Sequence, residues 1–313
     1  MRSAHLCVLP LILACASGGG LPPRAIELNT GGVQELAQGH LDDAEARFRL
    51  ALELHPRFAE PHANLGLVML RRGNLAAAED HLRTALQLDP DFDEAWSNLG
   101  VVLLERGELD DAAEAFERAL SIDPTLLDAR RNLADLWIRL RRFGAARAQL
   151  MRLVQLTDDG RAEGQLAYCE LRLDRPAAAR ARAERVLAVD PDEPHARLVR
   201  GLVHARAGRL DSAVADLLRA ERGDTRFDAR LRLVAIALQR GRLDEVPERL
   251  SWLLTQAPEH AGVRLLAAAY AMARGDAERA WGFARGALHL DAELTPARTI
   301  VRWACAHGAT GCR

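Results

Sequence analysis

The chain has 313 residues, of which 49% are hydrophobic and 27% are charged, and its formal net charge is −2 at pH 7. This near-neutral balance gives no reason to expect a nucleic-acid partner, because phosphate binding depends on an excess of cationic side chains. The sequence contains 42 arginines and no lysine. The absence of lysine excludes a Schiff-base lysine, a phosphate-loop lysine and a lysine general base.

Residues 1–14 have the pattern of an export signal. Arg2 precedes an apolar run from Leu6 to Ala14, which is shorter than the roughly 20 residues that a membrane span needs. This pattern predicts a secretory signal peptide. Residues 15–24 are rich in glycine and proline, and they predict a flexible tether before the folded part of the chain.

The end of the apolar run, Ile12-Leu13-Ala14-Cys15, resembles the bacterial lipobox. The resemblance implies that the Cys15 thiol carries a diacylglyceryl group and becomes the mature N-terminus. Ala16, and not aspartate, follows the cysteine, which implies an outer-membrane lipoprotein that faces the periplasm. Membrane contact would then be made through the N-terminal lipid only. The alternative is an ordinary signal peptide cut near residues 14–17, which would release a soluble periplasmic protein.

The remainder of the chain is organised by a repeat. Residues 93–124 read DEAWSNLGVVLLERGELDDAAEAFERALSIDP, which contains two amphipathic helical patterns, and a similar text ends 34 residues earlier at Pro90. The positions that close successive copies are spaced by 33 or 34 residues: Pro56, Pro90, Pro124, Asp158, Pro191, Thr225, Pro258 and Ala292. A fixed period of this length predicts stacked helix pairs that bury a continuous core.

Each recurring residue type has a mechanical role in a helix pair. Small residues such as Gly66 and Gly100 stand in the middle of each first helix, where they allow the second helix to approach closely. Gly107 and its equivalents follow the first helix, where a left-handed backbone is needed. Pro247 lies near the start of a second helix, a place where proline is tolerated.

The following set of residues resembles the tetratricopeptide repeat: Trp96, Leu99, Gly100, Gly107, Ala112, Phe116, Ala119 and Pro124. The resemblance implies an all-α fold, a right-handed α-solenoid of about eight helix pairs over residues 25–292. Residues 293–313 would form a capping helix and tail, because such arrays close on a helix with a polar outer face.

In this family the first helices of successive repeats line a concave groove that binds peptide segments. The residues expected in that groove are Asn64, Leu67, Asn98, Val101, Arg131, Asn132, Asp135, Gln165 and Tyr168. Asn64, Asn98 and Asn132 recur every 34 residues, and a carboxamide can pair with any peptide backbone because it has both donors and acceptors. The alternative is that these asparagines serve the structure between repeats. Arg131 and Asp135 have the i, i+4 spacing of a solvated ion pair.

Three cysteines lie beyond the export signal. Cys169 falls in a helical core pattern and is expected to be a buried small hydrophobe. Cys305 and Cys312 flank a turn-forming stretch, and they predict a disulfide in an oxidising compartment. Cys305, His307 and Cys312 lack a fourth ligand for zinc, so we expect no metal. The sequence contains no recognised catalytic or phosphate-binding motif, so we expect no catalytic residue and no cofactor.

These patterns predict a non-enzymatic protein–protein interaction scaffold in the bacterial cell envelope. A lipobox followed by a tetratricopeptide array resembles the type IV pilus biogenesis lipoproteins, which implies a secretin-like subunit or a peptide segment of another envelope protein as the partner. The alternatives are an adaptor for cell-wall enzymes or outer-membrane protein assembly, and a soluble exported regulator of a neighbouring enzyme.

Overall fold

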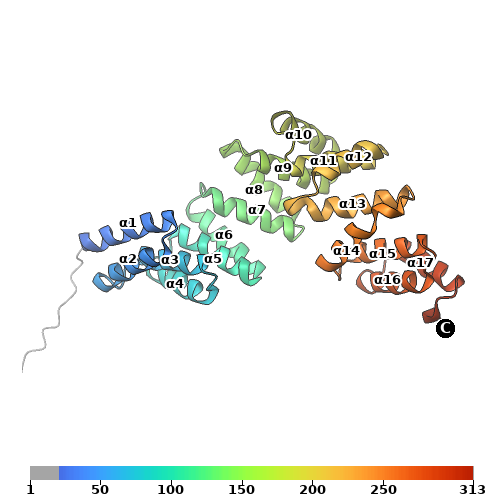
Figure 1. The fold of residues 1–313 in the computed structure, drawn as a ribbon. Helices are drawn as coiled ribbons and strands as arrows, with labels where there is room; N and C mark the ends of the chain where they lie inside the picture. Colours follow the sequence, from blue (N-terminus) through green and yellow to red (C-terminus); the bar gives the residue numbers. More distant parts are fainter. Residues whose placement is uncertain (1–20, 313) are drawn as a thin grey trace, which may run out of the picture. The chain divides into compact units, whose positions relative to one another are not determined.

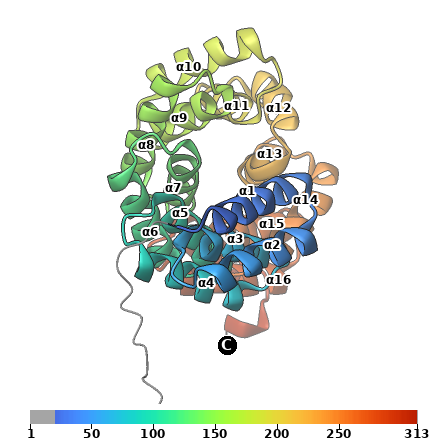
Figure 2. The ribbon, with the colours of Figure 1, turned by 90° about the vertical axis from the view of Figure 1, so that its left-hand side faces the viewer.

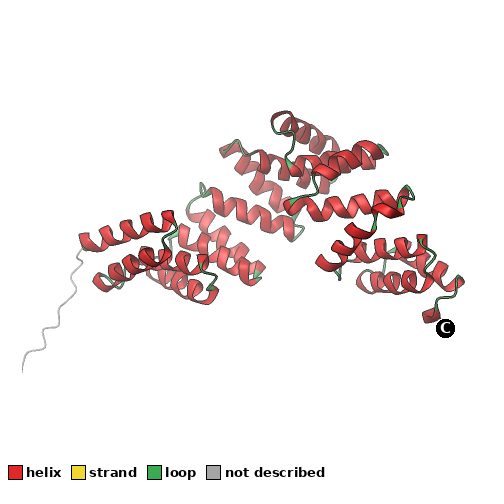
Figure 3. Cartoon of the chain, viewed as in Figure 1, coloured by secondary structure: helices red, strands yellow, loops and turns green. Residues whose placement is uncertain are grey.

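The computed structural model describes residues 21–312, and within that range it consists of helices and short loops without any strand (Figure 3). The all-α prediction is therefore confirmed. The predicted signal peptide, Cys15 and most of the tether lie outside the described residues. The first helix begins at Pro23, two residues before the predicted start of the array. Among the described helices, none combines the length and apolar character needed to cross a bilayer.

The chain divides into two compact units, one up to Asn132 and one from Leu133 onward. The helices of the first, N-terminal unit are α1 Pro23–Gln38, α2 Leu41–Leu54, α3 Ala59–Arg71, α4 Leu75–Leu88, α5 Asp93–Arg106 and α6 Leu109–Ile122 (Figure 1). Consecutive helices pack as pairs, α1 with α2, α3 with α4 and α5 with α6. The first helices of these pairs also contact one another, α1 with α3 and α3 with α5. The helix α7, Leu127–Arg139, crosses the boundary between the units.

The C-terminal unit continues the pairing. Its helices are α8 Phe143–Leu156, α9 Gly160–Arg172, α10 Pro176–Val189, α11 Pro194–Arg206, α12 Leu210–Arg219, α13 Arg226–Gln239, α14 Pro247–Gln256, α15 Ala261–Ala273, α16 Ala277–Leu290 and α17 Thr295–Ala306. Three short 3₁₀ turns supplement them: η1 Gly223–Thr225, η2 Leu243–Glu245 and η3 Thr310–Cys312. Figure 2 shows α9 and α11 side by side, and they are the first helices of successive pairs.

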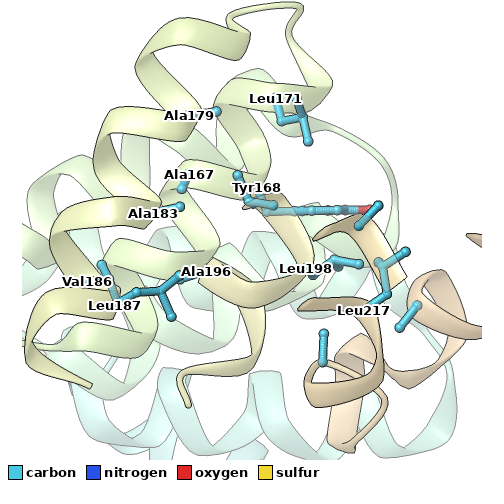
Figure 4. Packing of buried hydrophobic residues seen from close by; sticks show 14 of the residues in the cluster. Ala167, Tyr168, Leu171, Ala179, Ala183, Val186, Leu187, Ala196, Leu198 and Leu217 are labelled. Carbon is cyan, nitrogen blue, oxygen red and sulfur yellow. The ribbon is translucent and has the colours of Figure 1, made fainter. Parts of the chain in front are cut away.

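Close packing within each pair depends on matched side-chain sizes sixteen positions apart. A Cβ atom on Gly100 would lie 2.7 Å from Cε1 of the fully buried Phe116, and one on Gly66 would lie 2.6 Å from Cγ of Leu82. The small residue therefore makes room for a large one on the second helix. The C-terminal unit also uses alanine on both helices, as Figure 4 shows for Ala167 and Ala183.

The turn between the two helices of a pair requires a left-handed residue. Gly107, which follows α5, has φ 83°, and its amide donates to the carbonyl of Leu104. In the fourth and fifth pairs this position holds Arg141 with φ 59° and Asp174 with φ 57°. Residues with a Cβ atom are strained in this region, so stacking of the array maintains these two turns against the local preference of the chain.

Pro247 shortens the second helix of the seventh pair. The turn before it is the 3₁₀ segment η2, and α14 starts at Pro247 and has only 10 residues, against 14 in α16. The reason is that proline has no N–H to donate to the carbonyl of Leu243, four positions earlier. Proline is tolerated here as predicted, but the α-helix begins later than in the other pairs.

The C-terminal segment closes the array on α17, which packs against α16. A disulfide joins Cys305 at the end of this helix to Cys312 in the tail. The backbone amide and hydroxyl of Thr310 donate to the carboxylate of Glu278 on α16, at 2.8 and 2.9 Å. The tail is thus bonded to both of the last two helices.

The C-terminal unit contains a buried ionic cluster around His195. The imidazole lies 3.1 Å from Oε1 of Glu193 and 3.3 Å from Oδ2 of Asp224, which in turn lies 3.0 Å from Arg161. Burial alone would lower the pKa of His195, but the hydrogen bonds to Asp224 and Glu193 outweigh burial and raise the pKa to about 9. The bond to His195 lowers the pKa of Asp224 to about 2. Each group therefore favours the charged form of the other.

Candidate functional site

A groove of about 900 Å³ lies in the N-terminal unit, along the first helices α1, α3 and α5 and the first turns of α7. Four of the predicted residues line it: Asn64, Leu67, Asn98 and Arg131. We call it the acidic groove, because Glu60, Glu94, Asp123 and Asp128 lie in its wall. Arg131 is the one basic residue of its lining, so the formal charge of the lining is −3.

The amide of Asn64 is already part of a hydrogen-bonded chain across the groove. Its Nδ2 donates to Oδ1 of Asn29 at 2.9 Å, and Nδ2 of Asn29 donates to Oε2 of Glu60, also at 2.9 Å. Asn29 is buried on α1 and was missed by sequence reasoning. It lies 35 residues before Asn64, so it falls one position outside the 34-residue series. One end of the groove is therefore fixed by contacts within the protein.

Asn98 is different, because no described residue bonds to its amide. It is half-buried on α5 and lines the groove. Its donors and acceptor are therefore open to a ligand. Leu67 and Val33 line the same groove and offer it apolar surface.

The carboxylates of the groove differ in how well they are compensated. Asp128 accepts a hydrogen bond from Arg131 at 2.9 Å, and hydrogen bonds from the hydroxyl and amide of Thr125 lower the pKa of Asp123. The pKa of Glu94 is raised by desolvation and by its contact with Asp93. No cation among the described residues contributes to this shift, and a positively charged ligand would stabilise the ionised form of Glu94.

The other predicted residues fall outside the acidic groove. Val101 and Asn132 are half-buried on α5 and α7 and do not line it. Gln165 is only 3% exposed and donates to Oδ1 of Asp135 at 2.6 Å, so its amide serves a contact between α7 and α9. Tyr168 lies in the C-terminal unit, where its hydroxyl donates to Asp228 at 2.9 Å. All these residues follow the same sequence repeat. The repeat therefore does not distinguish side chains that line the groove from side chains that bond to other residues of the chain.

Within the part of the chain that the structure describes, one group of potential metal ligands comes together: Glu35, His40 and Asp43. The Glu35 carboxylate lies 3.0 Å from Nδ1 of His40 and 3.2 Å from Arg47. An arginine against the same carboxylate opposes a metal cation by charge repulsion. We therefore interpret these contacts as a network that secures the turn after α1.

Repeated helix pairs with a groove along their first helices define an all-α repeat protein, a class that serves protein–protein interaction. One family profile described as tetratricopeptide repeat matches residues 32–91, 64–126 and 165–229, and a second profile of the same description matches residues 103–168. The chain belongs to the tetratricopeptide repeat family. A comparison with curated proteins finds no match.

Two solved structures illustrate the shared fold. A chain of the APC/C hetero-tetramer Cut9–Hcn1 superposes with a TM-score of 0.63 at 14% identity, covering 84% of this chain and 52% of that one. The present chain thus spans about half the length of that relative. A tetratricopeptide repeat protein from Parabacteroides merdae gives a TM-score of 0.52 at 16% identity, covering 91% of this chain and all of that one. At these identities the likeness concerns the fold alone.

Proposed function

We propose that the chain is a non-enzymatic scaffold that holds an extended, cationic segment of a partner protein in the acidic groove. The observation that carries this proposal is Asn98, a half-buried amide with no bonding partner among the described residues, in a lining of formal charge −3. The unbonded amide of Asn98, the carboxylate of Glu94 and the net negative charge of the lining are the features that a peptide with arginine or lysine side chains would satisfy.

Each part of the groove has a role in this binding. The Asn98 amide pairs with the backbone of the segment, which gives affinity for many sequences. Glu94 attracts the cationic side chains, and ionic hydrogen bonds to a carboxylate are stronger than neutral ones. Leu67 and Val33 contact apolar side chains of the segment. Binding of this kind weakens as salt is added, because exposed charges are screened.

The test uses the full chain and blocked heptapeptides that carry a neutral dye. One peptide library has arginine fixed at its centre, and a matched library has glutamine there. We expect the arginine library to bind more tightly by fluorescence anisotropy. Asn98→Ala should weaken that binding about tenfold, which corresponds to the loss of one or two hydrogen bonds. Gln87→Ala removes an exposed amide on α4, outside the groove, and should change nothing.

Two results would contradict the proposal. Equal affinity for the arginine and glutamine libraries would show that the carboxylates of the groove do not select a cationic peptide. Unchanged affinity of a folded Asn98→Ala variant would show that the Asn98 amide does not bind the peptide. Circular dichroism of each variant establishes that the helices are retained.

We further propose that the scaffold acts in the bacterial envelope, attached to the outer membrane by a lipid on Cys15, with a secretin-like subunit as its partner. The support is the sequence pattern of residues 1–24 together with a tetratricopeptide array. Mass spectrometry of the mature N-terminus from native membranes should find an acylated Cys15, and Cys15→Ala should shift the protein to the soluble periplasm. An unmodified N-terminus would refute the anchor. Crosslinking to cell-wall enzymes or to the outer-membrane assembly machinery, and not to a secretin, would refute the partner.

A further inference from the structure

The C-terminal unit contains a second hollow, of about 450 Å³, along the first helices α9, α11, α13 and α15. Three arginines line it, Arg172, Arg206 and Arg232, against the single carboxylate of Asp228. We call it the arginine hollow. The formal charge of its lining is +2, which is opposite in sign to that of the acidic groove.

No described carboxylate contributes to the electrostatics of the Arg232 guanidinium. Its Nε is buried and has no hydrogen-bond partner among the described residues. Burial lowers its pKa, and the nearby charge of Arg206 lowers it further. Arg206 itself forms an ion pair with the exposed carboxylate of Asp174, at 3.6 Å. A half-buried guanidinium with a second cation beside it has an electrostatic cost, and an anionic ligand would relieve it.

Arg172 is held in place by contacts on two sides. Its guanidinium lies 4.6 Å from the ring centroid of Phe143, and Nη1 donates to the hydroxyl of Tyr168 at 2.9 Å. That hydroxyl donates in turn to Asp228. Figure 4 shows Tyr168 among the buried residues of the cluster that includes Leu198 and Leu217, so the whole arrangement rests on a packed core. A side chain fixed in this way loses little conformational entropy when it binds a ligand.

The walls of the arginine hollow are apolar. Leu171, Leu202, Leu231 and Leu266 contribute to its lining, one from each of the four helices. A free inorganic anion would leave this surface exposed to water. The ligand that satisfies both the cations and the leucines is a peptide in which an acidic side chain stands next to apolar ones.

We propose that the arginine hollow is a second peptide-binding site, which takes an internal glutamate or aspartate of a partner segment together with its apolar neighbours. The carboxylate lies between Arg206 and Arg232 and accepts hydrogen bonds from their N–H groups, a geometry that planar guanidinium groups favour. The apolar neighbours contact the leucine walls. The scaffold then has two surfaces, each selective for segments of opposite charge.

The test compares two libraries of blocked, amidated heptapeptides with a neutral dye, one with glutamate and one with glutamine at the centre, and leucine, isoleucine, phenylalanine or alanine beside it. The full chain should bind the glutamate library at least tenfold more tightly. Arg232→Gln should abolish that preference, whereas Arg226→Gln, on the same helix but outside the lining, should retain it. Leu202→Glu places a carboxylate inside the hollow and should also abolish binding, which gives a second variant if Arg232→Gln does not fold.

Other outcomes would overturn the inference. Equal binding of the two libraries, or an equal loss in Arg232→Gln and Arg226→Gln, would show that the hollow does not select carboxylates. If a phosphoserine library binds more tightly than the glutamate library, the ligand of the hollow is a phosphopeptide and not a carboxylate side chain. The result is independent of the acidic groove, because Asn98→Ala should leave binding of the glutamate library unchanged.

Discussion

The sharpest test of how the helix pairs are built is Gly100→Ala. The added methyl would lie less than 3.0 Å from three atoms of the buried Phe116 ring. Overpacking of this kind lowers the free energy of unfolding by up to about 3 kcal/mol. Replacing glycine by alanine inside a helix raises it by about 1 kcal/mol. The variant should therefore be destabilised by about 2 kcal/mol, the difference between these two effects.

Native-state hydrogen exchange of the full chain measures this change locally, which matters because a repeat array need not unfold in one step. Amides of α5 and α6 should lose protection about 30-fold, since each 1.4 kcal/mol is tenfold. Gly282→Ala in α16 is the matched control, because its added methyl would meet no described atom within 4 Å apart from its chain neighbours and the backbone of its own helix. Protection of α16 should rise about fivefold there, from helix propensity alone.

If Gly100→Ala raises protection of its helix as Gly282→Ala does, the predicted overpacking is refuted, because the Phe116 ring would then move aside without cost. A double variant sharpens the test. Gly100→Ala with Phe116→Leu recreates the combination of Ala134 and Leu150 at the equivalent positions of the fourth pair. We expect the double variant to be about 1 kcal/mol more stable than the sum of the two single changes, which is the coupling expected of residues in contact.

Three further predictions concern the C-terminal unit. Arg141→Gly should raise the free energy of unfolding by about 1 kcal/mol, because the backbone at this position has φ 59°. Arg139→Gly, in the helix α7, should lower it by about 1 kcal/mol. Urea titrations of the two variants should therefore give changes of opposite sign. Reduction of the Cys305–Cys312 disulfide should destabilise α17 by about 2 kcal/mol, because the disulfide restricts a short loop in the unfolded chain. If the amides of α17 are equally protected from hydrogen exchange with and without reductant, this prediction is wrong. The pKa of His195, about 9 when folded and about 6.5 when unfolded, is raised by folding. Its contribution to stability should therefore be complete below pH 6.5 and lost as the pH rises toward 9; His195→Gln should remove this dependence from melting curves.

Much of the fold could be predicted from the sequence because the repeat is a short-range pattern. The spacing of Gly100, Gly107 and Pro124 predicts a helix, a turn and a second helix without any knowledge of long-range contacts. The pattern is less informative where another residue type takes over a position. Arg141 does not signal a left-handed turn by its residue type, and aspartate, as at Asp174, does so far less strongly than glycine, so the sequence pattern alone does not reveal these two turns.

The candidate site was predictable only in part, for a different reason. Periodicity places Asn64, Asn98 and Gln165 at related positions, but it does not say which amide is already bonded. That depends on single neighbours outside the repeat pattern, Asn29 for Asn64 and Asp135 for Gln165. The arginine hollow shows the same limit, since Arg206 and Arg232 are separated by 26 positions and come together only through the stacking of α11 and α13.

The size matching within each pair also determines how such a chain can diverge. Because Gly66 faces Leu82 and Gly100 faces Phe116, a change on one helix is tolerated only when its partner sixteen positions later changes as well. Both partners lie in the same copy of the repeat, so duplication or shuffling of a whole copy transfers the compensation intact. Genetic exchange with a breakpoint between the two helices would separate them. The heritable module of this protein is therefore the helix pair, and junctions between copies are where recombined arrays should retain their fold.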